Sequence, residues 1–315
     1  MAATAFEANE GIIVANSKGE IIRFNSFFSE MSGYNTKDVA GENFGFLLSE
    51  SNQSNILSII FARLKNKGDW VGEVTCKSRC GREFLTKIKV AVVKNYKQEV
   101  SHFVISVTDI TQSKAIEDEI KKLAFYDELT GLANRRLLLE KISHACILSK
   151  RSQKSGALLF IDLDHFKQIN DQYGHDAGDR FLQDLAGKLN RCVREADTVA
   201  RFGGDEFVIL LENLSENSID ALADVKRLCS KIVEEVHIPL KIQDQNYTYS
   251  ISVGATLFWG RDDNIDEILK RADMAMYESK RSGRNTFKLF EEEFKEGSEW
   301  DRNQTSFDDS HVQIV

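Results

Sequence analysis

The spacing of the apolar residues changes once along this chain, near residue 113, and this change limits the folds open to it. Before it, short apolar runs alternate with turn residues; after it, apolar runs alternate with long amphipathic stretches. A length of 315 residues, at roughly 150 residues per domain, also predicts two domains with separate cores. We therefore expect a first domain over 1–112, a linker over 113–125, a second domain over 126–290 and a tail over 291–315.

The first region has the pattern of a small antiparallel sheet with helices on one side. Residues 11–14 and 21–24 form short apolar runs, the second containing Arg23, and flank the turn Ser17-Lys18-Gly19, which predicts a hairpin. The further strands expected here cover 70–76, 84–93 and 101–109. One face of an intervening helix is predicted to hold Ile56, Ile59, Ile60 and Leu64.

Residues 113–125 predict a continuous helix, because they contain no glycine or proline. Ile116, Ile120 and Leu123 recur at steps of four and three and form a narrow apolar seam. A seam this short does not dimerise alone, but it suits a signalling helix that pairs across a dimer.

The second region predicts an α/β (α+β) domain. Residues 157–162 have the composition of a buried strand, and 286–290 that of a final strand. An alternating strand is predicted to hold Tyr249, Ile251, Val253 and Ala255. Two amphipathic helices are predicted to turn inward Ile219, Leu222, Val225, Cys229, Ile232 and Val236, and Ile265, Ile268, Leu269, Ala272 and Met276. The second of these helices should end near Gly283.

The segment Arg201-Phe202-Gly203-Gly204-Asp205-Glu206-Phe207 has the strongest chemical signal. It lies between apolar runs, so its glycines predict a hairpin, and the consecutive acids repel each other unless a cation or donor meets them. A solvated acidic turn is the alternative. Asp162 and Asp164 close the strand at 157–162, which can bring Asp162 and Asp205 together. Two carboxylates with open positions suit Mg²⁺, which takes further oxygens from substrate phosphates.

Further motifs surround this hairpin in a fixed order. They are Asp127-Glu128-Leu129-Thr130-Gly131-Leu132-Ala133-Asn134-Arg135-Arg136, Phe160-Ile161-Asp162-Leu163-Asp164-His165-Phe166-Lys167-Gln168-Ile169-Asn170-Asp171, Gly174-His175 with Gly178-Asp179, Ser252-Val253-Gly254, Ala272-Asp273-Met274-Ala275-Met276-Tyr277, and Gly283-Arg284-Asn285. With them, residues 126–290 resemble the GGDEF domain, the family of diguanylate cyclases that join two GTP molecules into cyclic di-GMP. The resemblance implies a palm-like fold similar to adenylyl cyclase catalytic cores, with a mixed central sheet flanked by helices.

Carried over by position, the resemblance implies roles for single residues. Asp162, the Leu163 carbonyl and Asp205 would bind Mg²⁺ or Mn²⁺. Asn170 and Asp179 would read the guanine edge, since a carboxylate accepts from the N1 and N2 donors that adenine does not offer as a pair. The remaining implied substrate contacts are Phe166, Lys167, His175, Lys280 and Arg284.

The implied reaction is in-line attack of one GTP's 3′-hydroxyl on the α-phosphate of another, with pyrophosphate leaving, so two domains must face each other in a homodimer. Lys280 and Arg284, four residues apart, are expected on one face of the last helix, where they would neutralise the leaving group. Without the other motifs they would indicate only a solvated basic face. Asp205 is expected to assist deprotonation of the 3′-hydroxyl, with the metal alone as the alternative. Glu206 is its catalytic neighbour or a structural contact.

The motif Arg194-Glu195-Ala196-Asp197 lies shortly before the hairpin. At this distance the family has an inhibitory site, which binds the cyclic di-GMP product through arginine forks and an aspartate. By itself the motif is common on exposed helix ends, and that is the alternative for Arg194 and Asp197.

The first region resembles a PAS sensor domain, with less specific motifs. They are Gly11-Ile12-Ile13-Val14, Phe24-Asn25, Phe27-Phe28, Gly33-Tyr34, Trp70-Val71-Gly72-Glu73 and Asp109-Ile110-Thr111. No sensed ligand follows from them. Cys76 and Cys80 flank a predicted turn, and free thiols are expected there in preference to a redox pair.

Charge and composition exclude several other functions. Eight of the acids and two of the bases lie in 291–315, and the near-neutral remainder offers no basic face for nucleic acid. We expect that acidic tail to be disordered. The sequence has neither a signal peptide nor an apolar run of about 20 residues, which predicts a cytoplasmic protein without a membrane span.

Three rival functions remain beside a PAS-regulated diguanylate cyclase. One is an inactive GGDEF receptor that binds cyclic di-GMP or GTP, against which the intact Asp162, Asp205, Asn170 and Asp179 argue. A cyclase making a mixed or adenine dinucleotide is disfavoured by Asp179. A phosphodiesterase would need a further catalytic domain, for which 315 residues leave no room.

Overall fold

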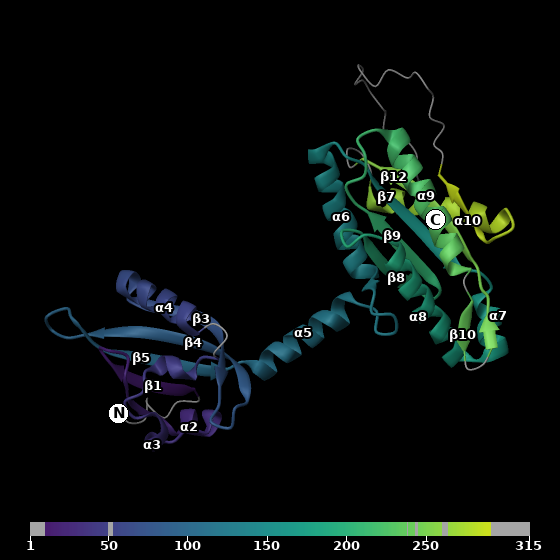
Figure 1. The fold of residues 1–315 in the computed structure, drawn as a ribbon. Helices are drawn as coiled ribbons and strands as arrows, with labels where there is room; N and C mark the ends of the chain where they lie inside the picture. The colour runs from purple at the N-terminus through teal and green to yellow at the C-terminus, as the bar shows by residue number, and fades with distance from the viewer. Residues whose placement is uncertain (1–9, 50–52, 238, 243–244, 260–263, 291–315) are drawn as a thin grey trace, which may run out of the picture. The chain divides into compact units, whose positions relative to one another are not determined.

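The computed structural model describes residues 10–49, 53–237, 239–242, 245–259 and 264–290. The chain forms two compact units that divide between Lys121 and Lys122, and each has its own sheet (Figure 1). The tail expected at 291–315 lies outside the described residues. Within the described ranges, no helix has the length and apolar character needed to cross a bilayer.

The first unit contains a five-stranded antiparallel sheet in the order β2-β1-β5-β4-β3. Its strands are β1 (Gly11–Asn16), β2 (Ile21–Phe24), β3 (Asp69–Lys77), β4 (Glu83–Lys94) and β5 (Val100–Asp109). Its helices are α2 (Ser26–Ser32), α3 (Thr36–Val39), the 3₁₀ helix η1 (Phe44–Leu47) and α4 (Gln53–Lys67). The predicted hairpin is confirmed, with Ile13 opposite Phe24. Asn25 begins α2, because its Oδ1 accepts from the backbone N–H groups of Phe28 and Ile12.

Burial in the first unit follows the period of two expected for strands, with one face of the sheet in the core. The prediction for α4 was wrong at one position: Ile60 and Leu64 are buried, but Ile59 is 56% exposed. Ile59 precedes Ile60 by a single residue, about 100° around a helix, so the two do not share a face. Cys76 and Cys80 are free thiols.

The helix predicted at 113–125 is α5, which spans Thr111–Phe125. Ile116, Ile120 and Leu123 are 48%, 59% and 56% exposed. The apolar seam is therefore uncovered in the single chain.

The second unit contains a six-stranded mixed sheet in the order β13-β12-β7-β9-β8-β6. Its strands are β6 (Ala133–Asn134), β7 (Gly156–Leu163), β8 (Thr198–Gly203), β9 (Glu206–Leu211), β12 (Ile251–Phe258) and β13 (Thr286–Leu289). Its helices are α6 (Arg135–Ser152), α7 (Phe166–Tyr173), α8 (His175–Cys192), α9 (Ser218–Val236) and α10 (Ile265–Arg281), and β10 (Leu240–Ile242) pairs with β11 (Gln245–Tyr247).

Helices cover both faces of this sheet, so β7 is buried along its whole length (Figure 1). Leu159 and Ile161 of β7 share a core with α8 and α9, whereas Leu158 and Phe160 share one with α6 and α10. Ile219 was predicted to face inward but is 75% exposed. It lies in the first turn of α9, directly after the capping residue Asn217 and Ser218, and the first residue that this helix buries is Ala221.

Candidate functional site

One end of the central sheet gathers the acidic residues of two motifs. In the antiparallel β7–β9 pair, Asp162 lies opposite Glu206. The Leu163 N–H donates to the Asp205 carbonyl at 3.2 Å, and Gly204 adopts φ +53° at the tip of the β8–β9 hairpin. This positive φ favours glycine. The hairpin and the strand end therefore hold three carboxyl groups close together.

Burial and mutual repulsion raise the pKa of two of these groups, Asp162 and Glu206. Burial raises the pKa of Asp162, and Asp205 and Asp164 raise it further, while the Lys280 ammonium, 2.8 Å from Oδ2, opposes them. Burial also raises the pKa of Glu206, followed by the charges of Asp162 and Asp205. Such crowding of negative charge is relieved by a bound cation.

The donors available at this sheet end fit a hard divalent cation, because all of them are oxygens. Throughout the described part of the chain, no group of three or more His, Cys, Asp or Glu side chains is placed to hold a metal ion. A cation here would need Asp162, Asp205 and a backbone carbonyl such as that of Leu163, with ligand phosphates completing its shell. Mg²⁺ and Mn²⁺ accept such mixed shells.

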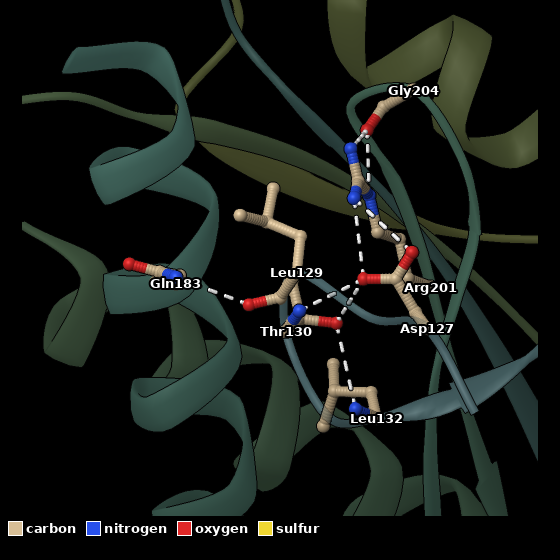
Figure 2. Close-up of polar contacts among 7 residues, drawn as sticks. All are labelled: Asp127, Leu129, Thr130, Leu132, Gln183, Arg201 and Gly204. Carbon is tan, nitrogen blue, oxygen red and sulfur yellow. Dashed lines mark hydrogen bonds and ion pairs between the residues drawn. The ribbon is translucent and has the colours of Figure 1, made fainter. Parts of the chain in front are cut away.

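Arg201 connects the tip of the hairpin to the segment that begins at Asp127 (Figure 2). Its Nε and Nη2 donate to the Gly204 carbonyl at 2.9 and 2.8 Å, and its Nη1 donates to both Asp127 oxygens at 3.2 Å. Asp127 Oδ1 also accepts from the N–H and hydroxyl of Thr130. Gln183 of α8 donates to the Leu129 carbonyl at 3.1 Å. The segment that follows α5 is thus attached to the hairpin.

Sequence reasoning missed this contact, although Asp127 and Arg201 both lie in motifs it named. The only available signal was that these two residues carry opposite charges and had been given no role, and 74 residues separate them in the sequence.

Where α7 packs against α8, a buried polar atom is unsatisfied. Asn170 Oδ1 is buried without a hydrogen-bond partner, although buried polar atoms are normally paired. A Cβ on Gly178 would lie 1.9 Å from that oxygen, so glycine makes room for the amide. Asp179 follows on α8 and is exposed. Both side chains carry oxygen atoms that can accept hydrogen bonds.

The other predicted substrate residues lie at the starts of α7 and α8 and at the end of α10. His175 is the first residue of α8, and Phe166 and Lys167 begin α7. The prediction that Lys280 and Arg284 share a face of the last helix was wrong. α10 ends at Arg281, and Arg284 lies in the following turn with φ +62°, because Gly283 adopts φ +109° and stops the helix.

The Arg194 motif lies beside a separate cavity. The Arg194 N–H donates to Asp197 Oδ2 at 3.0 Å, which closes a turn after α8. Both residues line a cavity of about 250 Å³. Asp224, Arg227 and Lys231 of α9 line it too, and Arg227 is paired with Asp224. Sequence reasoning missed them, since none of them belongs to a named motif.

Comparison with protein families places known domains over both units. The model "Diguanylate cyclase, GGDEF domain" matches residues 124–286, and a PAS domain model matches 9–112. The predicted order, a PAS domain followed by a GGDEF domain, is confirmed.

Two curated relatives show the range of activities among similar proteins. Cyclic di-GMP phosphodiesterase PdeR of Escherichia coli is 32% identical over 92% of this chain and 43% of its own length. Diguanylate cyclase TpbB of Pseudomonas aeruginosa is 33% identical over 71% of this chain and 51% of its own. The chain spans about half or less of the length of these relatives.

Two solved structures share the fold of the second unit. The coiled coil and GGDEF domain of DgcB from Caulobacter crescentus, in complex with c-di-GMP, matches 57% of this chain and 93% of that one, at 27% identity and a TM-score of 0.52. Diguanylate cyclase SiaD of Pseudomonas aeruginosa, in complex with its activator SiaC, matches 56% and 66%, at 32% identity and a TM-score of 0.50. The predicted mixed sheet flanked by helices is confirmed.

Proposed function

Because this chain belongs to the GGDEF domain family and contains a PAS domain before its GGDEF domain, we propose that it is a diguanylate cyclase that condenses two GTP molecules into cyclic di-GMP and two pyrophosphates. The observation that carries this proposal is the meeting of Asp162 with Asp205 and Glu206 at one end of the sheet, with Lys280 bonded to Asp162.

In this proposal the residues of the site bind the metal ion and the guanine base of one GTP molecule. Asp162, Asp205 and the Leu163 carbonyl would hold Mg²⁺ or Mn²⁺, which supplies positive charge at the triphosphate when bound. The unpaired Asn170 oxygen can accept from guanine, and Asp179 offers a second acceptor. Phe166 and His175 border the same nucleotide.

The basic residues of the site face the phosphates in this proposal. Lys167, Lys280 and Arg284 would neutralise the triphosphate and the leaving pyrophosphate. Asp205 is the group proposed to take the proton of the attacking 3′-hydroxyl. Glu206, whose pKa is raised by its burial, is its neighbour in the catalytic pair.

Two half-sites must meet for the reaction, so the active form is proposed to be a homodimer paired along α5. The PAS domain would set the alignment of the two helices. Cyclic di-GMP would inhibit by binding at Arg194 and Asp197, and the cavity they share with Arg227 supports this regulation.

The similarity to phosphodiesterase PdeR over 92% of this chain favours a second candidate. In that case the domain would bind GTP or cyclic di-GMP and regulate a further domain without condensing GTP.

One assay separates the two candidates. Purified protein is incubated with GTP and Mg²⁺, and the nucleotides are resolved by chromatography. We expect cyclic di-GMP and pyrophosphate from the wild type, and turnover at least about 100-fold lower from Asp205→Ala, the range for loss of one electrostatic group in an active site. Binding of GTP without product would establish the receptor, and near-normal turnover by a folded Asp205→Ala would refute the role of Asp205.

A further inference from the structure

Asp164 is a buried carboxylate beside the site, and its acceptors are already engaged. It is 4% exposed. Its Oδ1 accepts from the Ser252 hydroxyl at 2.7 Å, and its Oδ2 accepts from the Ser250 hydroxyl at 2.6 Å and from the Asn285 N–H at 3.1 Å. Asp162, two residues earlier, has an ammonium group as its neighbour instead. These bonds give Asp164 a role different from that of Asp162.

The turn that Asp164 holds is strained. Three consecutive residues, Gly283, Arg284 and Asn285, have φ values of +109°, +62° and +46°. This left-handed conformation is common for asparagine but unfavourable for arginine. Such a conformation persists only where the surroundings fix it. Here the Asn285 N–H is bonded to Asp164, and the Arg284 N–H donates to the Ser279 carbonyl at 3.2 Å.

The same carboxylate faces the arginine side chain. Arg284 Nε lies 4.0 Å from Asp164 Oδ1, and the Arg284 side chain is 44% exposed while that of Asp164 is 1% exposed. Asp164 thus acts on Arg284 in two ways, by a hydrogen bond to the backbone of the next residue and by charge attraction to the guanidinium group. An arginine held in this way loses less side-chain entropy when it binds a phosphate.

We propose that Asp164 is a positioning residue that fixes Arg284 toward the phosphates of a bound nucleoside triphosphate. This inference rests on the proposed function for the identity of that nucleotide. Ser252 lies in β12 and Ser250 directly before it, and both donate to Asp164. Hydrogen bonds thus connect the end of β7, the start of β12 and the turn after α10.

A double-mutant cycle on nucleotide binding tests the proposal. The ligand is a GTP analogue with a methylene group in place of the α,β-bridging oxygen, so that no turnover occurs, and its affinity is measured by calorimetry with Mg²⁺. We expect Asp164→Asn and Arg284→Ala each to weaken binding about tenfold, or about 1.4 kcal/mol. The double variant should bind no more weakly than Arg284→Ala alone, because Asp164 acts through Arg284.

Two readouts separate positioning from a purely structural role. Affinity for guanosine, which lacks phosphates, should be unchanged in Asp164→Asn. Ser155 is buried just before the opposite end of β7. Ser155→Ala removes the hydrogen bond from its hydroxyl to the Ser215 carbonyl and should lower Tm without changing analogue affinity. If Asp164→Asn does not fold, Ser250→Ala, which removes one hydroxyl from Asp164, should still weaken analogue binding.

Additive losses in the cycle, wild-type analogue affinity in a folded Asp164 variant, or failure of the wild type to bind the analogue would each overturn the proposal. The outcome is independent of catalysis. A chain that shows the coupling but forms no cyclic di-GMP refutes the cyclase and keeps the positioning role.

Discussion

The contact between Asn170 and Gly178 sets the shape of the proposed guanine site. Gly178→Ala would place a Cβ 1.9 Å from Asn170 Oδ1, so the amide must move. We expect the KM for GTP to rise at least about tenfold, since a buried acceptor that loses its partner costs about 1–3 kcal/mol.

Gly187→Ala is the matched control for this variant. It lies on the same helix, where the nearest atom to an added Cβ is the end of the Arg191 side chain at 3.5 Å. It should keep the wild-type KM and gain roughly 0.5–1 kcal/mol of stability. An unchanged KM for Gly178→Ala would contradict the placement of guanine beside Asn170.

The ionisation of Asp127 makes the free energy of unfolding of the second unit depend on pH. Its burial alone would raise its pKa, but hydrogen bonds from Thr130 and the charge of Arg201 outweigh burial and hold the pKa below the ordinary 3.8. A carboxylate with a lowered pKa in the folded state stabilises the fold at any pH above its unfolded value, and this contribution is lost as the pH falls through the folded value.

We therefore expect Asp127→Asn to lower the free energy of unfolding by about 1–3 kcal/mol at pH 7. The difference from wild type should shrink below about pH 4, as denaturant titrations at several pH values will show. Asp118→Asn, a change at an exposed position of α5, should have little effect at any pH. A deficit for Asp127→Asn that stays constant down to pH 2 would argue against an ionised pair with Arg201.

At the scale of elements, α8 and α9 fix each other's ends. Lys231 of α9 donates to the Cys192 carbonyl at the end of α8, at 3.0 Å, and Lys188 of α8 donates to the Val236 carbonyl at the end of α9, at 3.3 Å. Cations at helix C-termini are favourable. The turn containing Arg194 therefore leaves α8 from a fixed position.

Product feedback belongs to this pair of helices. Coupling of about 1–3 kcal/mol between sites corresponds to roughly 5- to 150-fold inhibition. We expect Arg194→Ala to raise the cyclic di-GMP concentration for half-inhibition within that range and to leave initial rates near normal. Arg191→Ala, which removes an ion pair with Glu235 and does not line the cavity, should behave as wild type. Identical inhibition curves for wild type and Arg194→Ala would show that the motif does not bind the inhibitor and is only an exposed helix end.

At the scale of the whole molecule, we expect activity to depend on the pairing of two chains along the exposed seam of α5. Ile116, Ile120 and Leu123 remain uncovered in one chain, and each GGDEF domain supplies only half of the proposed site. Specific activity should rise with protein concentration, and Ile120→Asp should shift that rise to concentrations at least about tenfold higher, because a charge in an apolar seam must be desolvated on pairing.

Light scattering on the same samples reports the oligomeric state. Lys122→Asp places an aspartate on a different side of α5. It should leave the protein concentration at which specific activity is half-maximal near that of the wild type. Activity per chain that stays flat on dilution, in a species shown to be monomeric, would exclude the dimer model.

Local patterns were enough to predict much of this fold. The β1–β2 hairpin, α5, β7 and the hairpin at Gly204 were all expected from glycine positions and apolar spacing, because these features depend on residues that are neighbours in the sequence. The spaced motifs also identified both domain families. Periodicity placed Ile59 and Ile219 wrongly. Ile59 lies about 100° around the helix from the buried Ile60, and Ile219 lies in the first turn of α9, ahead of the first residue that this helix buries.

Only the tertiary structure decided which distant residues meet. The pairing of Asp127 with Arg201 and of Asp164 with Asn285 joins segments 74 and 121 residues apart, and it depends on the order of strands in the sheet. The position of Arg284 depended on a left-handed turn that Asp164, the residue directly after β7, stabilises through the Asn285 N–H. Sequence therefore determined which chemical groups this protein has and in which local elements, whereas packing of the sheet determined which of those groups act together, because contacts across strands are set by the register of the whole sheet and not by any one segment.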